Sequence, residues 1–339
     1  MKVGLLAPPW IPVPPPSYGG IEVVVDCLAR GLTKAGHDVV VFTVGESEVP
    51  VATRFVHEHA AGDRIGADEV GLSHAAWAYE GFADRDVIHD HTLFGPLWAV
   101  AQGRDHVVAT CHGPIYGDLR HVYGFYGSRL PLVAISRDQA ARAPEVHVDA
   151  VIHHGVDPER FPSGQGDGGY LLFLGRMTPD KGAREAAQIA RACRRPLKIA
   201  AKMREVTERA YFHEQVEPLL GGDIEYVGEA DMDQKLRLLA DAQALLNPIH
   251  WAEPFGLVMI EALACGTPVL TYAIGSAPEI VEHGVTGFVC ADHAELIAAV
   301  GEVDRLRRRD CRAAVSEYFS TERMVADHIR LYERVRCAG

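Results

Sequence analysis

The sequence predicts an α/β protein with two domains, each built on a sheet of parallel strands. Short apolar segments typical of buried strands alternate with helical segments along the whole chain. The 339 residues, of which 48% are hydrophobic, suffice for two ordinary cores. A polar, glycine-rich segment at 157–169 interrupts the alternation and is typical of a linker. We therefore expect one domain over residues 1–156 and a second over residues 170–320.

The first domain begins with a strand at Lys2–Ala7, a proline-rich loop and a helix from about Ile21 to Ala35, which ends at Gly36. A second strand follows at Asp38–Thr43, and this strand–loop–helix–strand unit is the start of a parallel sheet. Further strands are expected at Asp86–His89, Val107–Cys111, Leu132–Ile135 and Ala150–His153.

Loops at the carboxyl ends of these strands are the expected ligand sites of such a sheet. Gly19 and Gly20 would let the backbone approach a phosphate. The loop lacks the GxGxxG pattern of nicotinamide-binding proteins, and a glycine turn without a ligand is the alternative. His112 follows the strand at Val107–Cys111 and would face the same edge, unless its role is structural. Three loop aromatics could stack on a sugar ring or on an aromatic acceptor: Trp10, Tyr18 and Tyr116.

The second domain is expected to repeat the alternation of strands and helices. Strands are expected at Tyr170–Leu174, Leu197–Ala200, Ile224–Val227 and near Leu245, and helices over about Glu205–Leu219 and Gln234–Asp241. A last amphipathic helix over Thr321–Arg336 is long enough to cross back to the first domain. We therefore group the segment from about 321 to 339 with residues 1–156.

The most informative stretch is Asn247–Leu270, which contains Glu253 and Glu261. Its helix is expected over Phe255–Ala264, with Pro254 in the first turn, and is apolar nearly all round. A buried glutamate is costly unless it is paired or binds a ligand, and a helix N-terminus attracts anions. A salt-bridged core residue is the alternative for either acid taken alone, but the two acids together favour a ligand site.

Arg176 and Lys181 form the strongest basic pair of the second half and lie at a strand-to-helix junction. An arginine offers a bidentate fork and a lysine a mobile point charge, and together they match a diphosphate. Two exposed surface cations are the alternative.

The charge and the cysteines limit the possible partners and the compartment. The net charge is −13 and acidic side chains outnumber basic ones in both halves, which argues against nucleic acid and anionic membranes as partners. The seven cysteines form no CxxC pair, as expected for reduced thiols. Prolines break the apolar N-terminus, so it is a poor signal peptide, and no apolar run could span a bilayer. We therefore expect a cytoplasmic protein.

Six segments together resemble glycosyltransferase family 4, the retaining nucleotide-sugar transferases of GT-B fold. They are SYGGIE at 17–22, TCHG at 110–113, GVDPERF at 155–161, GRMTPDKG at 175–182, EPFGLVMIEALACGTPVL at 253–270 and APEIVEHGVTGFV at 277–289. The paired glutamates, taken with the Arg and Lys of the fourth segment, are the specific part. The resemblance covers essentially the whole chain and implies two Rossmann-like domains facing a central cleft. The first would bind the acceptor and the second the nucleotide-sugar donor.

The resemblance also implies a role for each matched residue. Arg176 and Lys181 would hold the donor diphosphate, and Glu261 would bind the ribose hydroxyls. The catalytic candidates are Glu253, beside the reacting face of the donor sugar, and His112, on the acceptor side of that sugar. Further donor contacts would come from Gly20, Met203, Val227, Phe255, Gly256, Leu257 and Val258.

The chain departs from the family pattern in one turn. Ala200–Met203 stand where many relatives have a glycine-rich turn near the nucleotide, which leaves the base contacts open. Two D-x-D triplets, at 84–86 and 231–233, match the metal motif of another transferase class, but the first opens a strand and the second resembles a helix N-cap. We therefore expect no metal and no cofactor apart from the nucleotide-sugar substrate.

The leading hypothesis is a retaining, metal-independent transferase that moves a sugar from a nucleoside-diphosphate donor, expected to be a UDP-sugar, to a small oligosaccharide or natural-product acceptor. A fainter likeness to the antibiotic-tailoring branch, including avilamycin-type oligosaccharide assembly, suggests antibiotic biosynthesis. The alternatives are a GT-B epimerase or phosphorylase-like enzyme and a non-catalytic sugar-nucleotide-binding protein. Product analysis would separate the enzymes, and turnover after Glu253→Ala would separate catalysis from binding.

Overall fold

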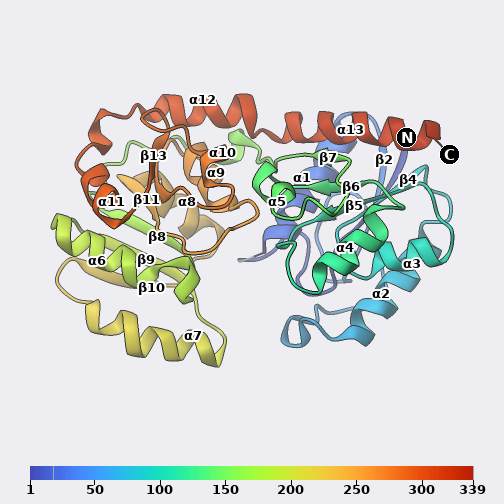
Figure 1. The fold of residues 1–339 in the computed structure, drawn as a ribbon, viewed down its shortest axis with the longest axis horizontal. Helices are drawn as coiled ribbons and strands as arrows, with labels where there is room; N and C mark the ends of the chain where they lie inside the picture. The colour runs from blue at the N-terminus through green and yellow to red at the C-terminus, as the bar shows by residue number, and fades with distance from the viewer. Residues whose placement is uncertain (18, 339) are drawn as a thin grey trace. The chain divides into compact units, whose positions relative to one another are not determined.

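The computed structural model describes residues 1–17 and 19–338, which divide into two compact units (Figure 1). Unit 1 contains Met1–Gly155 together with the segment from Thr321 onward, and unit 2 contains Val156–Ser320. Each unit has its own parallel sheet with helices, so the predicted α/β class is confirmed.

The sheet of unit 1 has seven parallel strands in the order β3-β2-β1-β4-β5-β6-β7. They are β1 (Lys2–Leu6), β2 (Asp38–Thr43), β3 (Ala52–Phe55), β4 (Val87–Asp90), β5 (Val107–Cys111), β6 (Leu132–Ala134) and β7 (Ala150–Val151). The buried strands read as continuous apolar runs because helices cover both faces of a parallel sheet. Pattern analysis does not predict β3, an edge strand whose four residues are all exposed.

The helices of unit 1 are α1 (Gly20–Lys34), α2 (Asp68–Gly81), α3 (Gly95–Ala101), α4 (Leu119–Gly127), α5 (Arg137–Ala141) and the C-terminal α13 (Thr321–Ala338). Helix α13 packs against α1, which confirms that it crosses back to the first domain. A Cβ at Gly31 of α1 would lie 2.5 Å from Cγ2 of Val325, so the close approach of the two helices requires glycine there.

The sheet of unit 2 has six parallel strands in the order β10-β9-β8-β11-β12-β13. They are β8 (Leu171–Arg176), β9 (Leu197–Lys202), β10 (Ile224–Gly228), β11 (Ala244–Asn247), β12 (Val269–Tyr272) and β13 (Gly287–Cys290). In both units the first strand lies beside the fourth, β1 beside β4 and β8 beside β11. The winding of the chain reverses at this switch point, and ligands of such sheets bind at the carboxyl ends of those two strands.

The helices of unit 2 are α6 (Ala183–Cys193), α7 (Val206–Tyr211), α8 (Met232–Asp241), α9 (Leu257–Ala264), α10 (Ala277–Ile280), α11 (His293–Val300) and α12 (Arg308–Tyr318). The single helix expected over Glu205–Leu219 is instead α7 followed by a π-helical turn at Phe212–Val216 and a 3-10 turn at Glu217–Leu219. The helical pattern of the sequence is correct there, but the hydrogen-bond spacing changes along it.

The segment at 157–169, expected as a linker, belongs to unit 2 and is packed on it. Gly164 donates its N–H to Cys265 O at 2.9 Å and accepts at its carbonyl from Arg308 Nε at 2.9 Å. A Cβ at Gly164 would lie 1.9 Å from the carbonyl oxygen of Ala240. The glycines that suggest a flexible linker therefore serve close packing instead.

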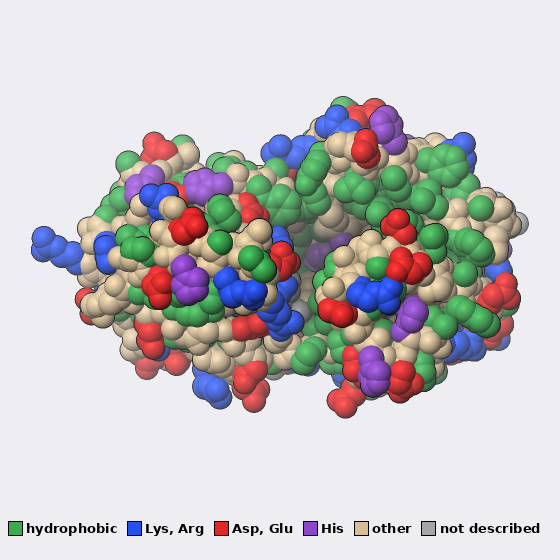
Figure 2. Space-filling model, turned by 90° about the horizontal axis from the view of Figure 1, so that it is seen from below, with side chains coloured by type: hydrophobic (Ala, Val, Ile, Leu, Met, Phe, Trp, Pro, Cys, Tyr) green, Lys and Arg blue, Asp and Glu red, His purple; other side chains and the backbone are tan. Residues whose placement is uncertain are grey.

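Side chains of all kinds are mixed on one face of the molecule (Figure 2). On the face shown in Figure 2, acidic, basic and histidine side chains are interspersed with hydrophobic ones. All seven cysteines are free thiols. Within residues 1–17 and 19–338, every helix is too short or too polar to span a bilayer.

Candidate active site

In unit 2, Lys181 and Glu253 form an ion pair at the carboxyl ends of β8 and β11. Lys181 ends a short 3-10 turn after β8, and Glu253 lies in the loop after β11. Their side chains are 12% and 16% exposed, and Lys181 Nζ also lies 5.5 Å from the centroid of the Trp251 ring. A largely buried pair of opposite charges thus occupies the switch point of this sheet.

Buried polar atoms without partners accumulate on the same two chain segments. Among the described residues, Arg176 Nε, Thr178 Oγ1, Trp251 Nε1 and Glu253 Oε2 are buried and make no hydrogen bond. Each such atom costs about 1–3 kcal/mol, and native proteins keep few of them. Their concentration on both sides of the switch point indicates a site that a polar ligand completes.

Two glycines with left-handed conformations let the loops of this site approach each other. Gly182 has a φ of 82°, and a Cβ there would lie 2.1 Å from the carbonyl oxygen of Pro248. Gly275 has a φ of 62°, and a Cβ there would lie 2.6 Å from the backbone nitrogen of Glu253. Any larger residue at either position would displace the loop that carries Glu253.

The helix that follows Glu253 begins later than predicted. Gly256 is the N-cap of α9 with a φ of 83°, a conformation outside the helical region, so Pro254 precedes the helix instead of occupying its first turn. A Cβ at Gly256 would lie 3.3 Å from Glu253 Oε2, so the start of α9 is close to the ion pair. The first N–H groups of a helix have no intrahelical acceptor. The predicted donor contacts here differ in burial: Phe255 is buried, whereas Gly256, Leu257 and Val258 are half-buried.

Glu261 is buried in α9 and is paired with a lysine that sequence reasoning misses. Its Oε1 accepts a hydrogen bond from Lys235 Nζ at 2.7 Å. Lys235 lies on α8, where a single lysine on an amphipathic helix looks like any surface cation. The available signal is Glu261 itself, since a carboxylate in an apolar helix requires a cationic partner or a ligand.

The two residues expected near the nucleotide base lie at the carboxyl ends of β9 and β10. Met203 directly follows β9, is half-buried and packs against the core of unit 2. Val227 lies in β10, where the register with β9 shifts between Tyr226 and Gly228. Both residues are at the ligand-binding edge, on the side of β8 away from β11.

Gly20 and His112 lie at the carboxyl edge of the sheet in unit 1. Gly20 is the first residue of α1, in the connection that leaves β1. His112 directly follows β5. Gln139 fixes the backbone on both sides of His112, because its Nε2 donates to the carbonyls of Cys111 at 2.9 Å and Gly113 at 2.6 Å.

Five histidines form a connected cluster in unit 1: His89, His91, His112, His154 and His328. Successive ring centroids in it are 4.0 to 5.2 Å apart. Burial lowers the pKa of every ring in this histidine cluster, to about 3 for His112 and about 4 for His328, so the cluster is neutral at pH 7. Sequence reasoning finds only His112, although the spacing of His89 and His91 puts both on one face of a strand.

The structure describes two of the three loop aromatics, and they differ in exposure. Trp10 is half-buried in the loop after β1, and Tyr116 is 61% exposed after β5. Tyr18 lies outside the described residues. An acceptor-side role for these residues stays a prediction.

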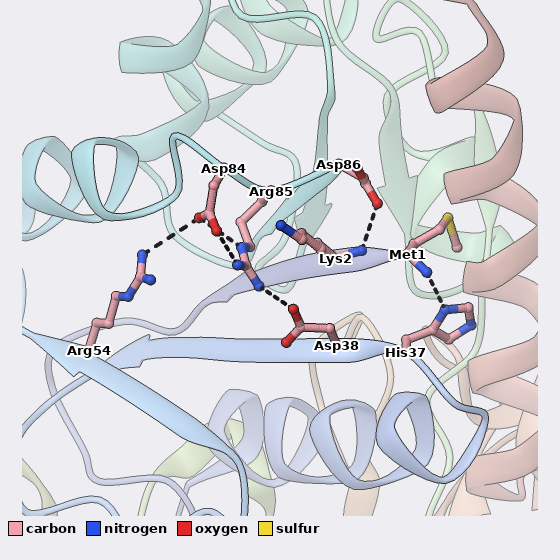
Figure 3. Close-up of polar contacts among 8 residues, drawn as sticks. All are labelled: Met1, Lys2, His37, Asp38, Arg54, Asp84, Arg85 and Asp86. Atoms are coloured by element: carbon pink, nitrogen blue, oxygen red, sulfur yellow. Dashed lines mark hydrogen bonds and ion pairs between the residues drawn. The ribbon is translucent and has the colours of Figure 1, made fainter.

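The first D-x-D triplet has structural partners. Asp84 pairs with Arg85 and lies 4.0 Å from Arg54 Nη1 (Figure 3). Asp86 accepts a hydrogen bond from the backbone N–H of Lys2 at 2.7 Å. Lys2 opens β1, so this contact is at the amino end of the strand, opposite to the edge that carries Gly20 and His112.

The second triplet starts a helix. Asp231 is the N-cap of α8 and accepts from the N–H of Gln234 at 2.8 Å, as predicted. In the part of the chain that the structure describes, no group of three or more His, Cys, Asp or Glu side chains is arranged to hold a metal ion.

Comparisons with known proteins identify the family. The family models described as Glycosyltransferase Family 4 and Glycosyl transferases group 1 match residues 18–160 and 157–314. Glycogen synthase of Mycobacterium tuberculosis is 31% identical over an alignment of 353 residues, which covers 86% of this chain and 83% of that enzyme.

Solved structures of similar proteins support the same family. AviGT4, a glycosyltransferase involved in avilamycin A biosynthesis, is 28% identical with a TM-score of 0.74, covering 100% of this chain and 98% of that one. Anabaena Alr3699/HepE in complex with UDP-glucose shares the fold at 17% identity, with a TM-score of 0.78 over 98% of this chain and 100% of that one. The two parallel sheets, the charged switch point of unit 2 and these matches lead to one conclusion: the chain belongs to glycosyltransferase family 4 and is a glycosyltransferase of GT-B fold.

Proposed function

We propose that this glycosyltransferase transfers a sugar, with retention of anomeric configuration and without a metal ion, from a UDP-sugar to a small oligosaccharide or natural-product acceptor. The observation that carries the proposal is the Lys181–Glu253 pair with its unpartnered polar neighbours at the switch point of unit 2. The similarity to AviGT4 supports an acceptor of the antibiotic-oligosaccharide type, and the UDP-glucose in the HepE structure supports the choice of UDP.

The diphosphate of the donor would bind to Arg176, Lys181 and the first N–H groups of α9. Arg176 Nε has no partner in the structure, and Lys181 could share its three N–H donors between Glu253 and a phosphate oxygen. The two cations and the helix terminus would stabilise the negative charge that the leaving diphosphate gains. This arrangement supplies the charge that a metal ion supplies in other transferases.

The sugar would react on the face from which the diphosphate leaves. The acceptor oxygen forms a bond to the anomeric carbon while the bond to the phosphate oxygen breaks and its electron pair stays on the phosphate. The acceptor proton moves to that phosphate oxygen. Glu253 would stabilise the oxocarbenium-like sugar while the two bonds exchange, because its Oε2 is unpartnered and the sugar becomes positively charged.

Glu261 would bind the ribose hydroxyls, and Lys235 would hold its Oε1 by a hydrogen bond. Lys235 Nζ and Glu261 Oε1 are 2.7 Å apart, so Lys235 would orient the Glu261 carboxylate before the nucleotide arrives. Met203 and Val227 would border the base, and unit 1 would hold the acceptor.

Thermal shift of the full chain with UDP, GDP, ADP and dTDP, each with Mg²⁺ or with EDTA, tests the donor part of the proposal. A ligand that binds only the folded state raises the Tm by mass action. We expect the largest shift with UDP, and the same shift with either additive. A larger shift with GDP or ADP would mean that the donor carries guanine or adenine instead of uracil. A shift that appears only with Mg²⁺ would overturn metal independence.

The sequence similarity to glycogen synthase favours a second candidate for the acceptor, an α-glucan. Release of UDP from UDP-glucose, measured with glycogen and with short oligosaccharides, separates the two acceptors. We expect faster release with the oligosaccharides. Faster release with glycogen would exclude the small acceptor.

A further inference from the structure

We propose that His91 is a positioning residue that holds His112 in one tautomer, so that His112 presents an N–H donor at Nδ1 to an oxygen of the sugar. The identity of that oxygen rests on the proposed function, whereas the tautomer does not. Nδ1 of His91 and Nε2 of His112 are 2.8 Å apart, and both side chains come from neighbouring strand ends, after β4 and β5.

Each of the two rings carries one proton. Burial holds the pKa of His91 well below its ordinary value and lowers that of His112 to about 3. Two neutral imidazoles can share a hydrogen bond in only two ways, because one nitrogen must donate and the other must accept. The bond therefore sets the tautomer of both rings together.

The environment of His91 distinguishes the two arrangements. His91 is 3% exposed, and among the described residues its Nε2 has no hydrogen-bond partner. If His112 donated, His91 would carry its proton on Nε2 and bury an N–H without an acceptor. If His91 donates from Nδ1, only a lone pair of Nε2 is left without a partner, which native structures tolerate more often than an orphaned N–H. The second arrangement is the one we infer.

The surroundings of the pair keep it in place. The ring of His89 lies 4.0 Å from that of His91 and is itself held between Tyr332 Oη and Thr110 Oγ1, each at 2.7 Å. The ring of His154 stacks on His112 at 5.2 Å with an interplanar angle of 20°. Rotation of either ring of the pair would therefore disturb several neighbours.

The chemical consequence concerns what His112 can do. With its proton on Nδ1 and Nε2 occupied by His91, His112 can donate a hydrogen bond to a sugar or acceptor oxygen but cannot take a proton from it. The proton of the acceptor hydroxyl must then leave by another route. The departing phosphate, which gains a lone pair as its bond breaks, is the group that the proposed reaction offers.

Ring-nitrogen NMR of the full chain, with ¹⁵N-labelled histidine, tests the tautomer without any substrate. Spectra of His91→Asn and His112→Asn assign the two rings. We expect a protonated Nδ1 and an unprotonated Nε2 in His112, and an unprotonated Nε2 in His91. A protonated Nε2 in His112 would overturn the inference even if the chain proves to be an active UDP-sugar transferase.

Two substitutions of His91 test the catalytic consequence. His91→Leu removes the donor, and we expect kcat for UDP release from UDP-glucose to fall about 10- to 100-fold with little change in KM, as for other side chains that orient a histidine. His91→Asn can place an amide N–H near the position of Nδ1 and should recover much of that loss. Full activity of His91→Leu, with unchanged ring signals of His112, would contradict the positioning role.

His328→Asn is the matched control. His328 belongs to the same cluster, but its Nδ1 lies 2.8 Å from its own helix carbonyl, Met324 O, and not from His112. It should lower the Tm as His91→Leu does, while kcat and the ring signals of His112 stay as in the unmodified chain. If it moves those signals to the same extent, the cluster acts through packing and His91 has no special role. If neither UDP-glucose nor another nucleotide sugar is turned over, the proposed function fails, and the NMR result still decides the tautomer.

Discussion

Unit 1 and unit 2 are built on sheets with the same switch point, yet the side chains at their ligand edges differ in charge. The Lys181–Glu253 ion pair lies at the carboxyl ends of β8 and β11, and a second ion pair, Lys235–Glu261, joins α8 to α9. At the carboxyl ends of β4 and β5 stand His91 and His112, two members of the histidine cluster, which is neutral at pH 7. One topology thus offers a charged edge suited to a nucleoside diphosphate and a neutral edge suited to hydroxyl groups.

The largest expected effect is a selective loss of stability of unit 1 at acid pH. Burial lowers the pKa of His74, to about 4, and of all five rings of the histidine cluster. Burial also raises the pKa of Glu22 and Asp90 to about 7, which acts in the opposite direction. More groups of unit 1 have a lowered pKa than a raised one, so near pH 5 its unfolded chain binds more protons than the folded one, and each extra proton is worth ~1.4 kcal/mol per pH unit.

The direction of this pH dependence follows from the lowered pKa values of the histidines. The contribution of the histidines is fully present above their unfolded pKa, about 6.5, and is lost as the pH falls below it. Hydrogen exchange resolved by unit at pH 7, 6 and 5 should show protection falling in unit 1 as the pH falls, with unit 2 as the internal reference. Parallel loss of protection in both units would remove the contrast between them.

The next largest effect is expected from Glu253→Gln in the charged edge. The amide keeps the shape of the side chain but cannot stabilise a positive sugar, so kcat should fall by about 10²- to 10³-fold, as when one preorganised electrostatic group is removed. UDP affinity should hold or rise, because a negative charge beside the diphosphate is lost. Initial rates and calorimetry measure the two quantities.

Glu302→Gln is the control for that variant, since Glu302 is a surface carboxylate of unit 2 that pairs with Arg305. It should leave both quantities unchanged. Unaltered turnover in Glu253→Gln would withdraw the catalytic role of Glu253 and leave the ion pair a structural one.

A smaller effect, on binding, is expected from Lys181→Ala. Loss of one charge-assisted hydrogen bond to the diphosphate should weaken UDP about 10- to 100-fold. The difference from the unmodified chain should shrink at high salt. Calorimetry at two salt concentrations measures it, and Lys198→Ala, whose Nζ lies over the ring of Tyr170, serves as control. Equal UDP affinity in Lys181→Ala would take Lys181 out of the site.

The smallest effect is expected from Lys235→Met, which tests the Lys235–Glu261 pair of unit 2. If Lys235 orients Glu261 toward the ribose, the substitution should lower the preference for UDP over 2′-deoxy-UDP by about fivefold, roughly the worth of one hydrogen bond. A competition titration measures the preference directly. A uniform loss of affinity for both nucleotides would mean that Lys235 acts only on the stability of α9.

Local patterns predict most of the fold because they act within one element. The bounds of β2 and β5 agree with prediction to the residue, since continuous apolar runs between polar loops define buried strands. The edge strand β3 has no such run, and the start of α9 depends on the left-handed Gly256, which composition alone does not reveal. The packed segment at 157–169 is missed because close approach and flexibility both use glycine.

The candidate site shows the same limit at longer range. Arg176, Lys181, Glu253 and Glu261 can be proposed from the sequence because the two cations share one strand-to-helix junction and the two acids share one apolar stretch. Their partners cannot: Lys235 pairs with a residue 26 positions away, and His91 with one 21 positions away. Such contacts depend on which distant elements pack together, α8 with α9 for Lys235 and β4 with β5 for His91.

The C-terminal helix α13 closes unit 1, and this affects the order in which the protein matures. During synthesis residues 1–155 leave the ribosome first, but the hydroxyl of Tyr332 that bonds His89 and the face that packs on α1 come only with α13. Unit 2, which is continuous in sequence, is complete before that helix exists. Since domains fold as units, residues 1–155 reach their final structure only after unit 2 has been made, and the histidines of unit 1 stay open to water and protons until α13 has been made.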